Sequence, residues 1–302
     1  MIGGQAVMEG VMIRNKNRVA TAVRTKKGII VNKQDFTSVT EGSSLFRLPI
    51  IRGAIGLIET MVLGIRTLNW STDMSLQEAD DLPVKKDNSF AIYVSVFIAI
   101  LLGIGLFIFL PLWVTTFFFN IEKTSIAFNL IAGIIRLTLF IVYILLIARL
   151  NDVKKLFQYH GAEHKMVNCY ENEPKASVKG CSKYTTIHNR CGTSFLLVVL
   201  IIAIIGFAIL DSVVAYALGY TTLWIRLITH ILFLPLILGV AYEIIRKAQN
   251  PNFFVKILIS PGLLFQKITT KEPDEKQLEV ALEAVKAVVA KDWKPGIVTI
   301  TA

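Results

Sequence analysis

Four long apolar stretches constrain the fold of this 302-residue chain more than any other feature. A helix needs about 20 apolar residues to cross a hydrocarbon core of roughly 30 Å, where only internal hydrogen bonds satisfy its backbone. Hydrophobic residues make up 54% of the chain, which is unusual for a soluble domain because so much exposed apolar surface would aggregate. We therefore predict four membrane-spanning helices, over residues 90–119, 125–149, 194–217 and 223–245. Pro111 and Pro235 are expected to kink the first and the fourth.

Basic residues are distributed unevenly around these helices, and this predicts their orientation. The turn between the first two helices holds only Glu122 and Lys123 as charges, and the turn between the last two holds none. The opposite ends carry the basic residues Lys85, Lys86, Arg149, Lys154, Lys155, Arg246 and Lys247. We therefore expect a multi-pass protein with both termini and the loop 151–192 on the cytoplasmic side. The first residues lack a basic start and an apolar run, so we expect no cleavable signal peptide.

The predicted fold class is mainly α: a polytopic membrane helical bundle with a small cytoplasmic α+β part. It has four spans plus one interfacial or re-entrant helix. The predicted segments are a cytoplasmic glycine-rich start and β-hairpin (1–44), an interfacial or re-entrant helix and linker (45–89), a first transmembrane hairpin (90–149), a cytoplasmic His/Cys loop (150–193), a second transmembrane hairpin (194–247), and a cytoplasmic amphipathic helix and tail (248–302).

Residues 45–70 combine a long apolar stretch with a few regularly spaced charges. They are apolar apart from Arg52, Glu59 and Arg66, which recur every seven residues and so form one narrow polar stripe on a helix. Three charges are costly in lipid, which favours an interfacial or membrane-dipping helix over a fifth span. A buried helix packed on the others fits the pattern equally well.

Local patterns outside the spans predict three further elements. Residues 19–24 and 28–31 are short apolar runs separated by a Lys-Gly turn, which is typical of a β-hairpin. Pro261 and Gly262 together predict a chain break after the fourth span. Residues 273–291 place apolar side chains at helical spacing, so we expect an amphipathic helix packed on the hairpin.

The loop 151–192 holds a candidate metal site. His160 and His164 are four residues apart, so on a helix both rings project from one face and can converge on a divalent cation. Glu163 lies between them in the order His-x-x-Glu-His, a pattern of inverted zinc-peptidase motifs in which the glutamate is the general base. The sequence therefore favours a divalent transition metal, with zinc first among the candidates.

Such a site needs a third ligand, and several residues compete for that place. His188 and Cys191 are the stronger partners because they lie one turn apart in the same loop. The remaining candidates are Glu171, Cys181, Cys169 and Glu9. An odd number of cysteines on a reducing side favours thiols over a disulfide.

Three other interpretations of the loop stay open. The histidine pair is often merely solvated on a helix surface, and two histidines with His188 and Cys191 would also make a closed structural zinc site. Cys191 with His188 as its base is a candidate nucleophile, although the nearby span leaves little room for an acyl substrate.

Among the polar residues inside the predicted spans, four form a possible second site. Arg136 lies near mid-depth in the second, and Asp211, Arg226 and His230 lie in the outer halves of the third and fourth. Intramembrane charges are rare and usually paired, so Asp211 is expected to pair with Arg226 or Arg136. A structural pair is favoured over an ion or proton path, and His230 by itself is expected to be a hydrogen-bonded packing residue.

Several stretches together resemble the YqhQ-like family of bacterial membrane proteins. The matching residues are 3–14, 159–165 (Tyr-His-Gly-Ala-Glu-His-Lys), 188–194 (His-Asn-Arg-Cys-Gly-Thr-Ser), 261–263, 269–273 and 277–281. The resemblance implies a bacterial inner (plasma) membrane and, because the family is also described as predicted metal-dependent enzymes, a metal. It implies no substrate.

The resulting hypothesis is a metal-dependent hydrolase at the cytoplasmic membrane face, acting on a membrane-proximal peptide or lipid. His160, His164 and His188 would be ligands with Cys191 as a fourth, Glu163 would be the base, and Glu9 would place water or substrate. The first alternative is a non-catalytic assembly factor, associated with a translocon or ribosome, whose metal is structural. The second is a transporter using Arg136, Asp211 and His230. Beyond the lipid bilayer, a membrane protein or peptide partner and a homo-oligomer are open; no nucleic-acid module is recognisable despite the net charge of +10.

Overall fold

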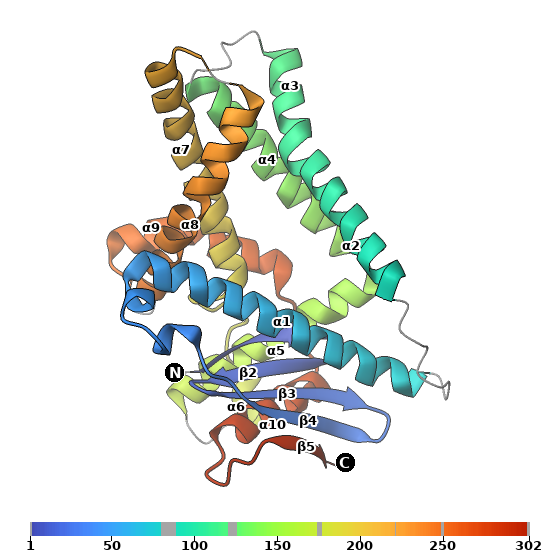
Figure 1. The fold of residues 1–302 in the computed structure, drawn as a ribbon. Coiled ribbons are helices and arrows are strands. Elements are labelled where there is room, and N and C mark those ends of the chain that lie inside the picture. The colour runs from blue at the N-terminus through green and yellow to red at the C-terminus, as the bar shows by residue number, and fades with distance from the viewer. Residues whose placement is uncertain are drawn as a thin grey trace.

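The computed structural model describes residues 2–79, 89–119, 126–173, 177–220, 222–248 and 251–300. Part of the predicted orientation depends on Lys85, Lys86, Glu122 and Lys123, which lie outside the described residues. The described chain is mainly helical, with a small antiparallel sheet at one end of a group of long apolar helices (Figure 1).

Four helices are long and apolar enough to cross a membrane, and they match the four predicted spans. The first is built from α2 (Ser89–Ile104), a π-helical segment η3 (Gly105–Phe109) and α3 (Leu110–Phe118). The others are α4 (Ile126–Ile147), α7 (Gly192–Leu218) and α8 (Leu223–Lys247). Pro111 lies in the first turn of α3, directly after the π-helical segment, and Pro235 lies inside α8. The described chain is therefore built like a membrane protein.

The sheet is a five-stranded antiparallel meander in the order β1-β2-β3-β4-β5. The predicted hairpin is confirmed as β3 (Arg18–Thr25) and β4 (Gly28–Asp35). The glycine-rich start adds β1 (Ile2–Val7) and β2 (Gly10–Asn15), and the C-terminal β5 (Gly296–Ile300) pairs with β4. The two ends of the chain thus meet in one sheet.

Both faces of this sheet are covered, which explains why its strands are apolar without strict alternation. One face packs on α5 (Asn151–Asn172) and α10 (Glu275–Val289), in a core that includes Val11, Met166 and Val285. The other face packs on α1 (Pro49–Ala79) through Leu63. Helix α10 begins at Glu275 because Asp274 and Gln277 form a reciprocal capping box.

Helix α1 runs across the molecule between the sheet and the spanning helices (Figure 1). It packs closely on α8, where an ion pair joins Arg52 to Glu243. Ile58, Met61 and Ile65 remain exposed on another side of the helix. Helix α1 is therefore packed on its neighbours, as the interpretation of residues 45–70 as a packed helix predicts. It still presents an apolar surface outward, as an interfacial helix would.

Four further elements complete the described chain. They are η1 (Val39–Glu41), η2 (Leu45–Arg47), α6 (Val178–Cys181) and α9 (Phe253–Thr269). The predicted break at Pro261 and Gly262 is wrong, because both residues lie inside α9. A Cβ on Gly262 would lie 2.8 Å from the Cα of Ser194, so this glycine allows α9 to pack against the start of α7.

Candidate metal centre

Helix α5 presents His160 and His164 on one face, as their spacing predicts. Their ring centroids are 4.4 Å apart. Gly161, between them, brings this part of α5 against the segment after α9, because a Cβ there would lie 1.9 Å from the carbonyl oxygen of Lys271. The helix propensity lost at this glycine is thus offset by a close contact that positions the histidines.

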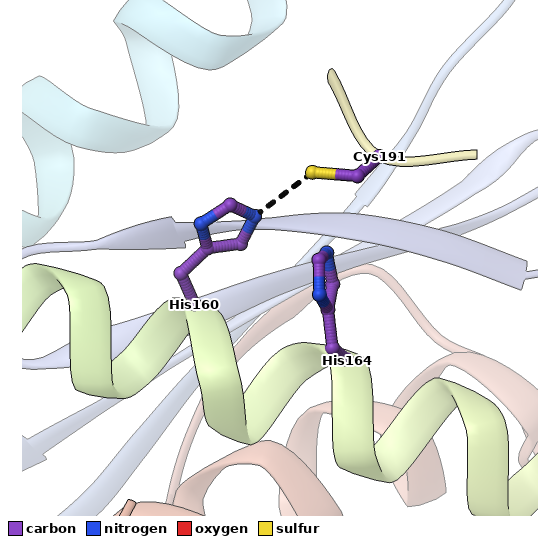
Figure 2. Close-up of side chains that lie close together, drawn as sticks. All are labelled: His160, His164 and Cys191. Carbon is purple, nitrogen blue, oxygen red and sulfur yellow. Dashed lines mark hydrogen bonds between the residues drawn. The ribbon is translucent and has the colours of Figure 1, made fainter. Parts of the chain in front are cut away.

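Cys191 approaches the same point from a different part of the chain. It is the N-cap of α7, with φ −65° and ψ 140°, and its sulfur accepts a hydrogen bond from the backbone N–H of Thr193. Figure 2 shows its Sγ facing the two rings, 3.2 Å from Nε2 of His160. The cap of a membrane-type helix thereby carries a thiol to the histidine pair.

The three side chains form the cluster that best fits a metal ion among the described residues. One ligand atom from each of His160, His164 and Cys191 lies within 4.8 Å of the other two. Tetrahedral zinc, with bonds of 2.0–2.3 Å, places neighbouring donors roughly 3.3–3.8 Å apart. Small side-chain movements therefore suffice, and two imidazoles with a thiolate are a donor set that zinc favours.

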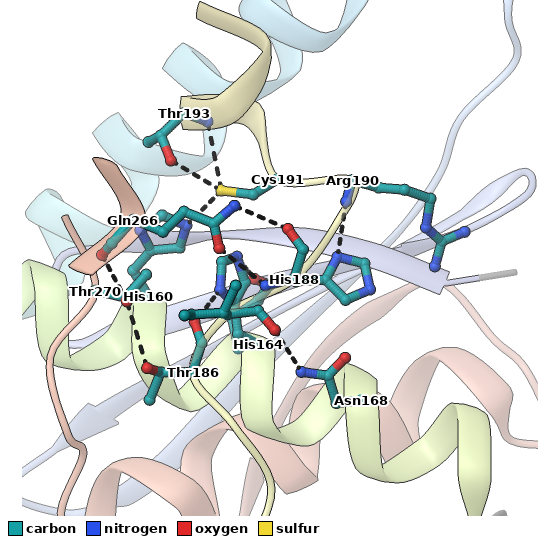
Figure 3. Close-up of polar contacts among 12 residues, drawn as sticks. His160, His164, Asn168, Thr186, His188, Arg190, Cys191, Thr193, Gln266 and Thr270 are labelled. Carbon is teal, nitrogen blue, oxygen red and sulfur yellow. Dashed lines mark hydrogen bonds and ion pairs between the residues drawn. The ribbon is translucent and has the colours of Figure 1, made fainter. Parts of the chain in front are cut away.

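Backbone carbonyl groups orient both imidazole rings. Nδ1 of His160 lies 2.9 Å from the carbonyl oxygen of Thr269, and Nδ1 of His164 lies 2.5 Å from that of Thr186 (Figure 3). Each hydrogen bond requires the proton on Nδ1, which leaves the lone pair on Nε2. Burial lowers the pKa of His160, so its neutral form is favoured further. Metal-binding histidines are typically held in this way.

Glu163 lies beside the cluster and is buried. Its carboxylate accepts a hydrogen bond from the backbone N–H of Gly4 and approaches Nε2 of His164 to 3.5 Å. Burial raises the pKa of Glu163 to about 7, with the nearby His160 acting in the opposite direction. A Cβ on Gly4 would lie 2.2 Å from the Met12 carbonyl oxygen and 3.1 Å from Cγ of Glu163, so β1 supplies a backbone wall that no larger residue could form.

The structure leaves His188 outside this three-residue cluster, although its ring centroid lies 5.7 Å from that of His164. Its Nε2 faces Glu171 at 3.7 Å, and its Nδ1 accepts the backbone N–H of Arg190 at 3.4 Å. Burial lowers the pKa of His188 to about 4, with the nearby His164 adding to the shift. His188 is thus a neutral neighbour, and Cys191 pairs with His160 rather than with His188.

Three other candidate ligands are placed elsewhere. Glu9, in the β1–β2 turn, contacts Lys155 at 2.5 Å and Tyr159 at 3.4 Å, so it does not reach the cavity of the cluster. Cys169 and Cys181 form a disulfide between α5 and α6. The expectation that they stay thiols or bind metal is wrong, because helix α6 returns over α5 and brings the two buried sulfurs together.

The cluster opens into a cavity of about 580 Å³ at the junction between the sheet and the spanning helices. Its walls come from β1, β2, α1, α5, the start of α7 and Tyr242 of α8. Three basic side chains, Arg14, Lys16 and Arg190, line it together with the cluster. The cavity therefore combines a largely apolar wall with basic side chains and the His/Cys cluster.

Gln266 holds this region together and was not recognised from the sequence. Its side chain accepts the backbone N–H of His188 and donates to the carbonyl oxygen of His188 and to the hydroxyl of Ser194, as Figure 3 shows in part. The one side-chain amide in a mostly apolar helix was the available signal. The carbonyl groups of Thr186 and Thr269 gave none, because any residue type supplies a backbone oxygen.

The polar residues of the spanning helices form a second, separate cluster. Asp211 accepts a hydrogen bond from Nε2 of His230 at 2.9 Å and lies 3.6 Å from Nε of Arg226. The ring of His230 also stacks on Phe207, with centroids 4.0 Å apart. Of the two partners expected for Asp211, the structure supplies Arg226, while Nε of Arg136 donates to the carbonyl oxygen of Phe107 instead.

The fold and site define a membrane-type helical protein with a small sheet domain and a His/Cys cluster where the two parts meet. The chain belongs to the family described as "Protein of unknown function (DUF1385)", which matches residues 48–291. It is also 31% identical over 301 residues to the "Uncharacterized protein YqhQ" of Bacillus subtilis (strain 168), covering 93% of this chain and 90% of that protein. The resemblance to YqhQ-like proteins is thus confirmed. No solved structure matches the chain.

Proposed function

We propose that this protein is a metal-dependent hydrolase of a bacterial plasma membrane, with zinc held by His160, His164 and Cys191. The observation that carries the proposal is the orientation of the two rings. Each donates from Nδ1 to a backbone carbonyl, and Nε2 of His160 then meets the Cys191 thiol at 3.2 Å. Two imidazoles and a thiol held in this way are a preorganised set of metal donors.

Bound zinc would supply Lewis acidity and a water of lowered pKa. Three protein ligands leave a fourth position, which is the arrangement of catalytic rather than structural zinc sites. Glu163 is the proposed general base: it takes a proton from the attacking water and returns it to the leaving group as the acyl or phosphoryl bond breaks. Its placement beside His164, at the wall of the cavity, supports this role.

The position of the cavity supports a substrate at the membrane surface. It is bordered by the interfacial-type helix α1 and by the beginning of α7, where a lipid or a membrane-proximal peptide would arrive. The basic side chains of Arg14 and Lys16 favour an acidic group on that substrate, whereas the charge of Arg190 is matched by Glu171.

The proposed orientation keeps both termini and the cavity on the cytoplasmic side, following the basic ends of the spanning helices. A disulfide is uncommon in that compartment, so the Cys169–Cys181 pair counts against this orientation and makes a direct test necessary. A green fluorescent protein fused after residue 302 is expected to fluoresce in cells. A fusion to a phosphatase that is active only after export is expected to be inactive; the reverse pattern would overturn the orientation.

Metal analysis of the purified full chain tests the centre itself. We expect one zinc per chain in the wild type and strong losses in His160→Ala and Cys191→Ser. His188→Ala is the matched control, since it removes a neighbouring buried histidine from outside the cluster. Absence of metal in the wild type refutes the proposal. Loss of metal in His188→Ala as well would show that His188 is a fourth protein ligand.

An open position distinguishes an enzyme from an assembly factor with a closed structural metal. In cobalt-substituted protein, acetohydroxamate is expected to change the visible absorption spectrum because it can take the fourth position. Glu163→Gln is expected to keep this response and the metal while losing hydrolysis. A spectrum that does not respond favours the structural alternative, in which the basic face binds a translocon or ribosome.

A further inference from the structure

A second cavity lies inside the helical bundle, apart from the His/Cys centre. It measures about 340 Å³ and is enclosed by η3, α3, α4, α7 and α8. Most of its wall is apolar, including Leu112, Phe207, Ile231 and Leu234. Its size lies near the lower end of the range for small-ligand pockets, which leaves room for one narrow chain and excludes a two-tailed lipid as a whole.

Arg136 of α4 brings a positive charge to the wall of this cavity. Its Nε donates to the carbonyl oxygen of Phe107 at 2.7 Å. Pro111 follows four residues after Phe107 and has no N–H, so it cannot occupy that oxygen as a normal helical donor would. The proline therefore leaves the Phe107 carbonyl oxygen available to hold the guanidinium of Arg136 in place.

The charges around the cavity do not balance. Asp211 is matched by Arg226, at 3.6 Å, and is also bound by His230. Among the described residues no carboxylate lies within 4 Å of Arg136. Burying an arginine charge in a membrane without a counter-charge costs free energy, so an anion bound in the cavity would stabilise Arg136.

Asn129 supplies a second unused donor in the same cavity. It precedes Arg136 by seven residues on α4, which places both on one face of the helix. Its Nδ2 is buried and has no hydrogen-bond partner among the described residues. An unpartnered amide beside an unmatched guanidinium favours a ligand with negatively charged oxygen atoms.

We infer that this cavity binds the head of a single-chain anionic amphiphile, whose carboxylate or phosphate meets Arg136 and Asn129 while its chain lies along the apolar wall. Ile231 and Leu234 line the cavity and are also 60% and 41% exposed, so the chain can continue past them from the cavity toward lipid. The site depends on none of the residues of the His/Cys centre, and it stands even where the proposed hydrolase activity fails.

Equilibrium binding of radiolabelled laurate to the full chain in dodecyl maltoside tests the inference. We expect saturable binding of about one laurate per chain, competed by other single-chain anions but not by monolaurin or dodecyltrimethylammonium. The concentrations at which unlabelled lysophosphatidic acid and unlabelled laurate displace the label are then compared. The stronger competitor shows whether the site prefers a phosphate or a carboxylate head group. Equal competition by neutral monolaurin would overturn the role of charge.

Variants of α4 and α8 make the test specific. Arg136→Gln is expected to weaken laurate binding by at least about tenfold, because it removes a charged hydrogen-bond donor, while Arg136→Lys retains most of it. Arg149→Gln, two residues after the end of α4 and outside the cavity, is the matched control. Ile231→Trp keeps Arg136 and reduces the space, so it should weaken binding even where Arg136→Gln fails to fold. Unchanged binding in Arg136→Gln or in Ile231→Trp contradicts the inference.

Discussion

Histidine serves different purposes in the two polar clusters. One cluster holds His160 and His164 beside the sheet, and the other holds His230 with Asp211 and Arg226 among the spanning helices. His160 and His164 donate from Nδ1 to backbone carbonyl groups, which leaves Nε2 of His160 facing the Cys191 thiol and Nε2 of His164 facing Glu163. His230 donates from Nε2 to Asp211, whose charge Arg226 already matches. The difference teaches that converging metal-type donors identify a candidate metal site, whereas an ion pair closed by a histidine indicates a structural role.

Breaking the bundle cluster should produce the largest loss of stability. Asp211→Asn leaves Arg226 without its carboxylate in an apolar setting, and removal of one partner of such a pair costs about 3–5 kcal/mol. Thermal unfolding in detergent measures the effect, with the neighbouring Ser212→Ala as the control. The metal content should stay at the wild-type level; a loss of metal from Asp211→Asn would erase the distinction between the two clusters.

Opening the disulfide should destabilise the sheet region alone. Cys169→Ser combined with Cys181→Ser removes a cross-link across 12 residues, worth about 3 kcal/mol in the chain-entropy description. Hydrogen exchange should increase in α5 and α6 and stay unchanged in α7 and α8. Thiol counting of the untreated, denatured protein should find Cys191 as the free thiol; three free thiols would show that the bond does not form.

Matched glycines compare close packing in the two regions. Gly161→Ala should lower stability by about 2 kcal/mol and reduce metal binding, because its Cβ would meet the Lys271 carbonyl oxygen at 1.9 Å. Gly206→Ala in α7 should be neutral or stabilising, since the nearest atom is Ile237 Cδ1 at 3.6 Å. Equal melting temperatures for both variants would show that α5 is not held against the segment after α9.

The metal-free protein should lose stability as the pH rises through the range where Glu163 ionises. Burial raises the pKa of Glu163 from 4.5 to about 7, so the folded state holds this proton more firmly than the unfolded state does. The favourable contribution is complete below pH 4.5 and declines by about 1 kcal/mol per pH unit between pH 5 and 7. Denaturant titrations of wild type and Glu163→Gln should diverge in this window, and parallel curves would argue against the buried carboxylate.

The spans, the β3–β4 hairpin and the histidine spacing were predictable because each depends on a local period of the sequence. The remaining strands were not: β1 is rich in glycine, and β5 gains its partner β4 from the other end of the chain. The site was half predictable for the same reason. The pairing of His160 with Cys191 and the carbonyl contacts of Thr186 and Thr269 depend on how α5, α7 and α9 meet, which no local pattern contains.

The disulfide shows where reasoning from composition misled. Three cysteines and a presumed reducing side predicted thiols, yet α6 places Cys181 beside Cys169 and leaves Cys191 as the free one. The same geometry removes two rivals for the metal and assigns the sulfur ligand to Cys191.

Zinc K-edge X-ray absorption of the zinc-loaded full chain tests most directly whether His160, His164 and Cys191 bind one zinc ion. The expected first shell holds one sulfur at about 2.3 Å, two imidazole nitrogens at about 2.0–2.1 Å and one light atom from solvent, and the sulfur contribution disappears in Cys191→Ser. A wild-type spectrum without sulfur, or a chain that retains no stoichiometric zinc, would contradict the account.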